Sequence, residues 1–484
     1  MRRIVHLLGT FSIFLSLSGC SNSSDVVLDM YINGIDFQNW VSYEDISENG
    51  LIENKYVDEC NRLLEEKGFD FQVAFHYKEN RAIDSRKSDY YQNLLLNEYA
   101  DTYSDTEADI VPIYRTDEDR CLNLDSYLED HDEFYNSLPA IAWMTCMQNG
   151  SVFAVPHSHN YIEQSAYLVS DELNLETGKD YKEVFSAIQS FGQSTQSMYL
   201  PIQSSSLMFS NFDSDQYLLN ANFPCLSVVY DNKWRISPYY ENEEVLEFYE
   251  SAQALIKDGY TEVGLTDEEA LEKQANGMLV QPTTFYPGFE DDSVQEGYHL
   301  VPFQNVKLST GVSYAILKNS SHPDEAFTFL ELLNTDTDFI DLFLYGLEGV
   351  DYKIKDGVVE GVSAEWIAPG KNGTSTFVNP RKATEFSGLK EAFEKQDEQY
   401  KTVKIDPIQF AIHALDIREF SSHLDLVNFM LFQYPTHDGK DPMEELKESF
   451  DQIEAEQKLD KLESKLNELA QEYEKLLTEF YQSK

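Results

Sequence analysis

Basic residues are scarce in this chain: 36 lysines and arginines stand against 86 aspartates and glutamates, a formal net charge of −50 over 484 residues. A surface this acidic repels the phosphates of nucleic acids and the headgroups of anionic lipids. We therefore expect the chain to bind neither of them electrostatically. The sequence also lacks Cys-x-x-Cys, Gly-x-Ser-x-Gly, His-Glu-x-x-His and phosphate-loop motifs. These absences argue against a zinc site, a serine hydrolase, a metalloprotease and a nucleotide enzyme, and no cofactor is expected.

Long apolar runs are missing after the first residues of the chain, so no later segment is expected to cross a membrane. At the start, Arg2 and Arg3 precede an apolar run from Ile4 to Leu17, which suits a signal peptide. The run leads into Leu-Ser-Gly-Cys, which resembles the lipobox of bacterial lipoproteins. We therefore expect a signal peptide at 1–19, a lipidated Cys20 with a tether over 20–25, and a cell-membrane location facing outward. The alternative is a plain secretory signal in which Cys20 is incidental.

The remaining cysteines, Cys60, Cys121, Cys146 and Cys225, are widely spaced. In an exported chain, four buried thiols and one or two disulfides are both compatible with this spacing. His157 and His159 would point the same way on a strand and could chelate a metal. Because no nearby cysteine or histidine completes a tetrahedral set, ligand hydrogen bonding or a plain loop is the preferred interpretation, and no metal is expected.

Strands alternate with a helix in the first part of the chain. Residues 26–32 and 69–75 have β-strand patterns, and 108–113 is a short apolar segment. Between the first two, residues 53–67 place apolar side chains on one helical face, and Gly68 stands where a C-cap glycine would. The order strand, helix, strand predicts a parallel sheet in an α/β fold, and the length of the chain favours two lobes.

Several short motifs occur in a fixed order along the chain. They are the segments Ala108–Val111, Leu122–Leu128, Gly150–Pro156, Tyr167–Leu175, Asn276–Val280, Lys318–Ala326 and Asp341–Tyr352. Together they resemble the extracellular solute-binding proteins of ABC importers, particularly the carbohydrate-type lipoproteins. The last segment is similar to the "nyGiEGkhY" element of an oligosaccharide-like subgroup. Residues 369–377 depart from that subgroup, which there usually reads near "FGNqf".

The resemblance implies a two-lobed periplasmic-binding-protein-like fold of type II, with several hinge crossings and a C-terminal helical segment. Its first lobe would comprise 26–115 and 290–335, and its second lobe 116–289 and 336–484 with the C-terminal helices. Hinge closure around a ligand is the expected motion.

Sugars present apolar faces and many hydroxyls, so their sites combine aromatic rings with carboxylates, amides and arginine. The loops that the resemblance places at the cleft contain such residues. The candidate ligand-binding residues are Asp36, Trp40, Arg115, His157, Tyr161, Phe285, Tyr286 and Trp366, with Asn33, Asn39, Tyr114, His159, Asn160, Thr283 and Thr284 beside them. Core packing is the alternative role for each aromatic residue.

The function that the resemblance implies is capture of an extracellular solute, an oligosaccharide, and its delivery to a membrane permease. No chemistry is expected of this chain, because its acidic pairs, such as Asp291 and Asp292, are adjacent residues typical of solvated faces. A glycosidase instead needs two carboxyls flanking the scissile bond. Binding of a peptide or another polar solute stays open as an alternative.

The end of the chain has a heptad-like stripe. Its members are Leu462, Leu466, Leu469, Tyr473, Leu476 and Phe480. This spacing predicts a helix. Because the stripe is short, docking on the rest of the chain is preferred to a coiled-coil dimer.

Overall fold

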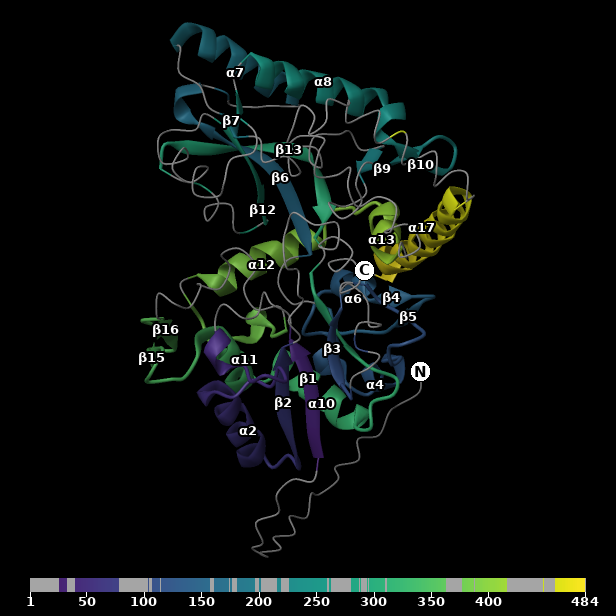
Figure 1. The fold of residues 1–484 in the computed structure, drawn as a ribbon. Coiled ribbons are helices and arrows are strands. Elements are labelled where there is room, and N and C mark those ends of the chain that lie inside the picture. The colour runs from purple at the N-terminus through teal and green to yellow at the C-terminus, as the bar shows by residue number, and fades with distance from the viewer. Residues whose placement is uncertain are drawn as a thin grey trace, which may run out of the picture.

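The structure is a computed structural model. It describes residues 26–32, 40–77, 103, 107–113, 115–156, 161–173, 175, 181–195, 200–201, 216–218, 226–258, 261–262, 280–286, 288, 294, 296–309, 311–362, 377–386, 388–415, 447 and 458–483. The elements form a lower and an upper lobe, with α12 and α13 between them (Figure 1). The two-lobed α/β architecture expected from the sequence is confirmed.

The lower lobe is built on a four-stranded sheet of order β14-β3-β1-β2. The strands are β1 (Val26–Ile32), β2 (Phe71–Tyr77), β3 (Ile110–Ile113) and β14 (Ser313–Ile316). Strand β1 runs parallel to β2 and β3, whereas β14 is antiparallel to β3. The predicted parallel sheet is confirmed, although β2 begins two residues later than expected. The cause is the preceding turn, in which the N–H of Phe69 still donates to the carbonyl of Leu64.

Helix α2 (Lys55–Lys67) shows how local sequence sets its own ends. The side chain of Asn54 accepts hydrogen bonds from the N–H groups of Tyr56 and Val57, and Gly68 closes the helix at φ +84°. Such caps satisfy main-chain groups that the helix leaves without intrahelical partners. The predicted helix over 53–67 and its glycine cap are therefore confirmed.

Further helices and short strands surround the lower sheet. They are η2 (Tyr43–Asp45), α4 (Asp125–Leu128), α5 (Asp132–Tyr135), α6 (Ala140–Thr145), β4 (Met147–Gln148), β5 (Ser151–Val152), α10 (Pro323–Thr335), α11 (Thr337–Tyr345), β15 (Lys353–Lys355) and β16 (Val358–Glu360). The ring of Phe134 on α5 lies 5.6 Å from that of Phe327 on α10, and Val155 forms a β-bridge with Tyr314. Residues 116–156, which the resemblance assigned to the second lobe, thus contribute to the core beneath the lower sheet.

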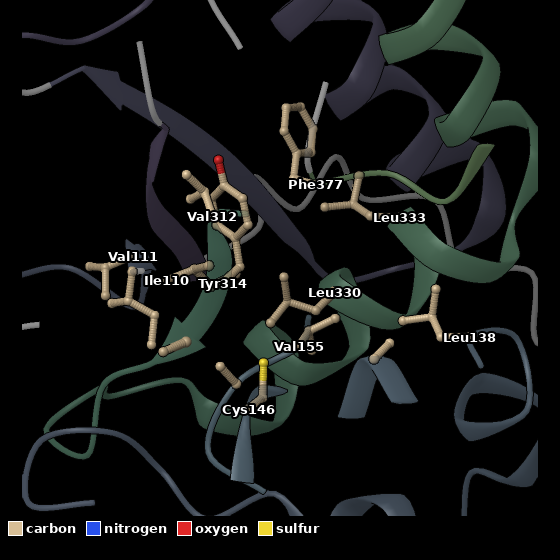
Figure 2. Close-up of a cluster of buried hydrophobic side chains, with 14 of the residues drawn as sticks. Ile110, Val111, Leu138, Cys146, Val155, Val312, Tyr314, Leu330, Leu333 and Phe377 are labelled. Atoms are coloured by element: carbon tan, nitrogen blue, oxygen red, sulfur yellow. The ribbon is translucent and has the colours of Figure 1, made fainter. Parts of the chain in front are cut away.

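Figure 2 shows part of that core, where Tyr314 of β14 lies among side chains from β3 and α10 and the Cys146 sulfur lies near Val155. Cys60, Cys121 and Cys146 are buried free thiols, and Cys225 lies outside the described residues. Burial raises the pKa of the Cys146 thiol to about 11, which keeps it protonated and unreactive at neutral pH. The described cysteines therefore pack as apolar side chains.

The upper lobe contains an antiparallel sheet of order β12-β6-β13. Its elements are β6 (Ile162–Ser170), η4 (Asp171–Leu173), α7 (Tyr181–Thr195), β7 (Leu200–Pro201), β8 (Gln216–Leu218), β9 (Leu226–Tyr230), β10 (Trp234–Pro238), η6 (Tyr239–Glu241), α8 (Glu243–Lys257), β11 (Thr261–Glu262), β12 (Val280–Phe285) and β13 (Tyr298–Leu308). Helices α7 and α8 lie over the outer side of the lobe, where the rings of Phe185 and Phe248 are 5.8 Å apart.

The final elements are η8 (Pro380–Lys382), α12 (Leu389–Tyr400), α13 (Pro407–Ala414) and α17 (Lys458–Ser483). Helix α17 docks on the same chain: the Tyr473 ring stacks 5.3 Å from that of Phe410 on α13, and its hydroxyl donates to the carbonyl of Met147. The predicted helix and its intramolecular docking are confirmed. Leu477 is more buried than the predicted Leu476, because a straight helix of 3.6 residues per turn drifts from a heptad stripe.

Among the described residues, no helix combines the length and apolar character that a bilayer crossing requires.

Candidate functional site at the junction of the lobes

The short helix η8 holds one side of the junction to the lower lobe. The buried Asn379 donates from its side-chain amide to the carbonyls of Ser137 (3.0 Å) and Asn334 (3.2 Å). Its amide oxygen accepts from the N–H of Arg381 at 3.2 Å. Asn379 thereby caps η8 and places Arg381 at the boundary between the lobes.

Arg381 connects η8 to α12 and to Tyr161, the residue just before β6. Its guanidinium donates to the side chain of Gln396 (2.7 Å) and to both carboxylate oxygens of Asp397 (3.1 and 3.3 Å). The same group lies 4.5 Å from the ring centre of Phe393 and 5.6 Å from that of Tyr161. One buried cation therefore joins three segments that are distant in sequence.

Tyr161 is the described residue at which the chain enters the upper lobe. Its N–H donates to the hydroxyl of Tyr400 on α12 at 3.0 Å, and its carbonyl accepts from the N–H of Ser309, where the chain returns. Burial raises the pKa of Tyr161 well above its ordinary value of 10, so the phenol stays neutral. The outgoing and returning crossings are thus bonded to each other beside α12.

The end of β12 packs against α12. The half-buried Tyr286 packs on Leu389 and Phe393 of α12. Gly288 follows at φ +89°, and a side-chain Cβ there would come within 2.5 Å of the carbonyl oxygen of Ala392. Only glycine allows this approach in that conformation. Strand β12 and α12 therefore meet closely at the junction.

The described fold is similar to that of several solved structures. The N-glycan transport solute binding protein (NgtS) from Streptococcus pneumoniae matches with a TM-score of 0.62 and 14% identity over 93% of this chain and 99% of that chain. Its structure in complex with Man5GlcNAc matches with a TM-score of 0.60 and 16% identity over 95% of this chain and 99% of that chain. Alginate-binding protein AlgQ2 without calcium ion matches with a TM-score of 0.52 and 14% identity over 93% and 99%. No protein-family model and no curated protein sequence matches the chain.

This chain has the solute-binding-protein fold. The fold implied by the order of short sequence motifs is confirmed by structures that align over nearly the whole chain. At identities of 14–16% the likeness establishes the fold and leaves the ligand to be argued from the residues themselves.

In this solute-binding fold, two of the candidate residues from the lower lobe have packing or capping contacts. Trp40 is 2% exposed, with its ring 5.0 Å from that of Phe343 and 5.2 Å from that of Phe75. Arg115 is buried and donates to the carbonyls of Ile412 and His413 at the end of α13 and to that of its C-cap residue, Leu415. A cation at the carboxyl end of a helix complements the helix dipole.

The structure brings Tyr161 and Tyr286 together along α12, whereas Phe285 is buried in the upper lobe beside them. Asp36, His157 and Trp366 lie outside the described residues, as do Asn33, Asn39, Tyr114, His159 and Asn160. Thr283 and Thr284 lie within β12. Within the described ranges, no cluster of His, Cys, Asp or Glu side chains could hold a metal ion.

Sequence reasoning missed Arg381, Glu163 and Lys307. Glu163 near the start of β6 and Lys307 near the end of β13 pair across the sheet, and this pairing brings together residues far apart in the sequence. The sequence near Arg381 gives no signal of its role, because its partners are Tyr161, just before β6, and residues of α12.

Proposed function

We propose that the chain is the substrate-binding component of an ABC importer, which captures an extracellular oligosaccharide and delivers it to a membrane permease. The observation that carries this proposal is the two-lobed fold shared over 95% of the chain with NgtS, a structure whose ligand is Man5GlcNAc. Its support in the chain itself is the aromatic and hydrogen-bonding junction formed by Tyr161, Tyr286, Arg381 and Tyr400.

The architecture supports a closing motion of the lobes as the means of capture. The crossings meet beside α12, so a change in the angle between the lobes is absorbed at Tyr161, Ser309 and the segment after η8. A ligand that contacts both lobes favours the closed state by its higher affinity for that state. The permease then recognises the closed form, and the chain itself performs no chemistry.

A thermal-shift screen of the soluble body from Ser21 onward tests the ligand class. Ligands that bind only the folded state raise the melting temperature in proportion to the logarithm of their concentration. We expect a rise with one class of oligosaccharide and none with short peptides. Shifts with peptides alone would contradict the sugar assignment and favour the peptide alternative.

The proposal includes a lipid anchor on Cys20 and export of the mature chain. Intact-mass analysis of the membrane-bound protein is expected to show an amino-terminal cysteine carrying diacylglycerol. Cys20→Ser is expected to leave the protein in the aqueous phase of a detergent partition, because the sulfur that would carry the diacylglycerol is lost. An unlipidated wild-type terminus would contradict the anchor and leave the binding role intact.

A further inference from the structure

Three side chains form a row across the hinge-proximal end of the upper sheet. Glu163 of β6 and Lys307 of β13 are direct register partners. Phe285, the last residue of β12, pairs with Gln164 of β6. Because the two strands are antiparallel, the next residue, Tyr286, lies opposite Glu163. In the order β12-β6-β13, opposed residues share one face of the sheet. The row thus offers a phenol, a carboxylate and an ammonium beside one another.

Glu163 and Lys307 are partly shielded from water, yet solvent reaches both. Each side chain is half-buried. Burial lowers the pKa of the Lys307 ammonium to about 8, against the opposing pull of Glu163. Burial raises the pKa of the Glu163 carboxyl, against the opposing pull of Lys307. Charges in such surroundings hydrogen-bond a ligand more strongly than charges in bulk water.

The Tyr286 ring is held in place for a ligand contact. Its hydroxyl is hydrogen-bonded to Ser309, and its ring packs on Leu389 and Phe393. Burial raises the pKa of this phenol, which stays neutral. A fixed aromatic ring with some exposed surface provides a face on which the C–H groups of a sugar can stack at little cost in side-chain entropy.

A purely structural role explains this row less well. Two opposite charges shielded from water contribute little net stability, and apolar residues of similar size often stabilise a sheet equally well. The row also lies where Ser309 bonds to Tyr161 and β12 meets α12, at the boundary that a ligand between the lobes would contact.

We propose that Tyr286, Glu163 and Lys307 form a subsite for one neutral pyranose unit of the ligand. The Lys307 ammonium donates to one sugar hydroxyl, the Glu163 carboxylate accepts from its neighbour, and Tyr286 lies against the ring. This inference rests on the proposed function and narrows its substrate class. The Glu163 carboxylate repels the carboxylate of a uronate. It also offsets the attraction that the Lys307 ammonium would exert on such a ligand, so we expect a neutral sugar to be preferred.

Calorimetric titration of the soluble protein tests the subsite with Man5GlcNAc as the neutral probe and an alginate oligosaccharide as the anionic one. Lys307→Met and Glu163→Gln are each expected to weaken binding of the neutral probe by roughly 10- to 100-fold, since each removes the charged partner of one sugar hydroxyl. The control is Lys355→Met, which removes the exposed partner of Glu360 on the β15–β16 hairpin. That variant should change the affinity by less than about twofold.

Folded variants at Lys307 and Glu163 that bind the neutral probe as the wild type does would overturn the subsite and leave the proposed function standing. Stronger wild-type binding of alginate than of the neutral probe would overturn the neutral-ligand assignment. Failure of the wild type to bind any saccharide would defeat the proposed function and the subsite together.

A labelling experiment on the wild-type protein avoids any dependence on variant folding. Acetic anhydride at pH 8 acylates deprotonated amines, and the lowered pKa makes Lys307 deprotonated to a far larger extent than an ordinary lysine. Saturating Man5GlcNAc is expected to slow acylation of Lys307 by at least about tenfold while leaving Lys355 unchanged. Equal protection of both lysines, or of neither, would overturn the proposal.

Discussion

The two lobes use polar side chains differently near their strand ends. In the lower lobe, the Asp109 carboxylate accepts from the N–H of Asp29 (3.0 Å) and the hydroxyl of Ser320 (2.5 Å), and Arg115 binds helix carbonyls. In the upper lobe, Glu163 and Lys307 face each other across two strands and keep contact with solvent. These polar groups of the lower lobe already have hydrogen-bond partners within the chain. We therefore place ligand specificity at the upper strand ends.

The strongest way to test this contrast is Trp40→Ala in the lower lobe. Trp40 packs against Phe75, Phe343 and Phe377, so we expect a loss of about 3–5 kcal/mol in the free energy of unfolding. Urea denaturation measures this loss. Trp40→Phe, which keeps a ring, should retain wild-type affinity for oligosaccharide. A Trp40→Phe variant that is stable but no longer binds would instead place Trp40 in the ligand site.

A smaller effect is expected at the junction, from Arg381→Met. This change removes a donor to the buried Gln396 and the contacts over Phe393 and Tyr161, which should cost about 1–3 kcal/mol. The bond to the more exposed Asp397 adds little. Thermal unfolding and ligand titration together are the measurement, and we expect both to weaken.

The matched control is Arg62→Met on α2, where the arginine pairs with Glu59 at the surface. Arg62→Met should change neither the melting temperature nor the affinity for the ligand noticeably. If Arg381→Met behaved like this control, Arg381 would not connect the lobes in the way described.

The smallest effect concerns pH and Asp341, whose carboxylate accepts from the N–H and hydroxyl of Thr384 just after η8. Burial raises the pKa of this carboxyl to about 6 from 3.8. The folded protein therefore holds the proton more tightly than the unfolded chain, and this contribution to stability is present below pH 4 and lost as pH rises through 6.

Asp341→Asn removes that titration. Relative to the variant, the wild type should lose about 1–2 kcal/mol of stability between pH 4 and pH 7. Denaturant unfolding of both proteins at the two pH values measures the difference. Stability curves that stay parallel over this range would contradict the raised pKa.

Features with local causes could be predicted from the sequence. The caps of α2 at Asn54 and Gly68 involve residues next to the helix, and the stripe of α17 needs only its own spacing. The two-lobed fold class was implied by the family resemblance of the ordered motifs, although identity to NgtS is only 14% and the lobe assignment of residues 116–156 was wrong. The caps and the stripe could be predicted because they reflect turn chemistry and helical periodicity, whereas the fold class rested on the resemblance.

The site was harder to predict because its contacts join distant segments. A position after a strand indicates the edge of the sheet but not which side chain turns inward, so Trp40 and Arg115 could not be distinguished from surface residues. The aromatic rings of Tyr161 and Tyr286 favour a ligand contact, but nothing in the sequence indicates that both residues contact α12. Arg381 was missed since nothing near it in sequence marks its burial.

The central claim is that an oligosaccharide binds between the lobes and closes them. Small-angle X-ray scattering of the soluble protein, with and without a saturating amount of the oligosaccharide that gives the largest thermal shift, tests it most directly. We predict a smaller radius of gyration in the bound state, because closure brings the lobes together. A bound protein whose scattering curve matches that of the free protein would contradict capture by closure.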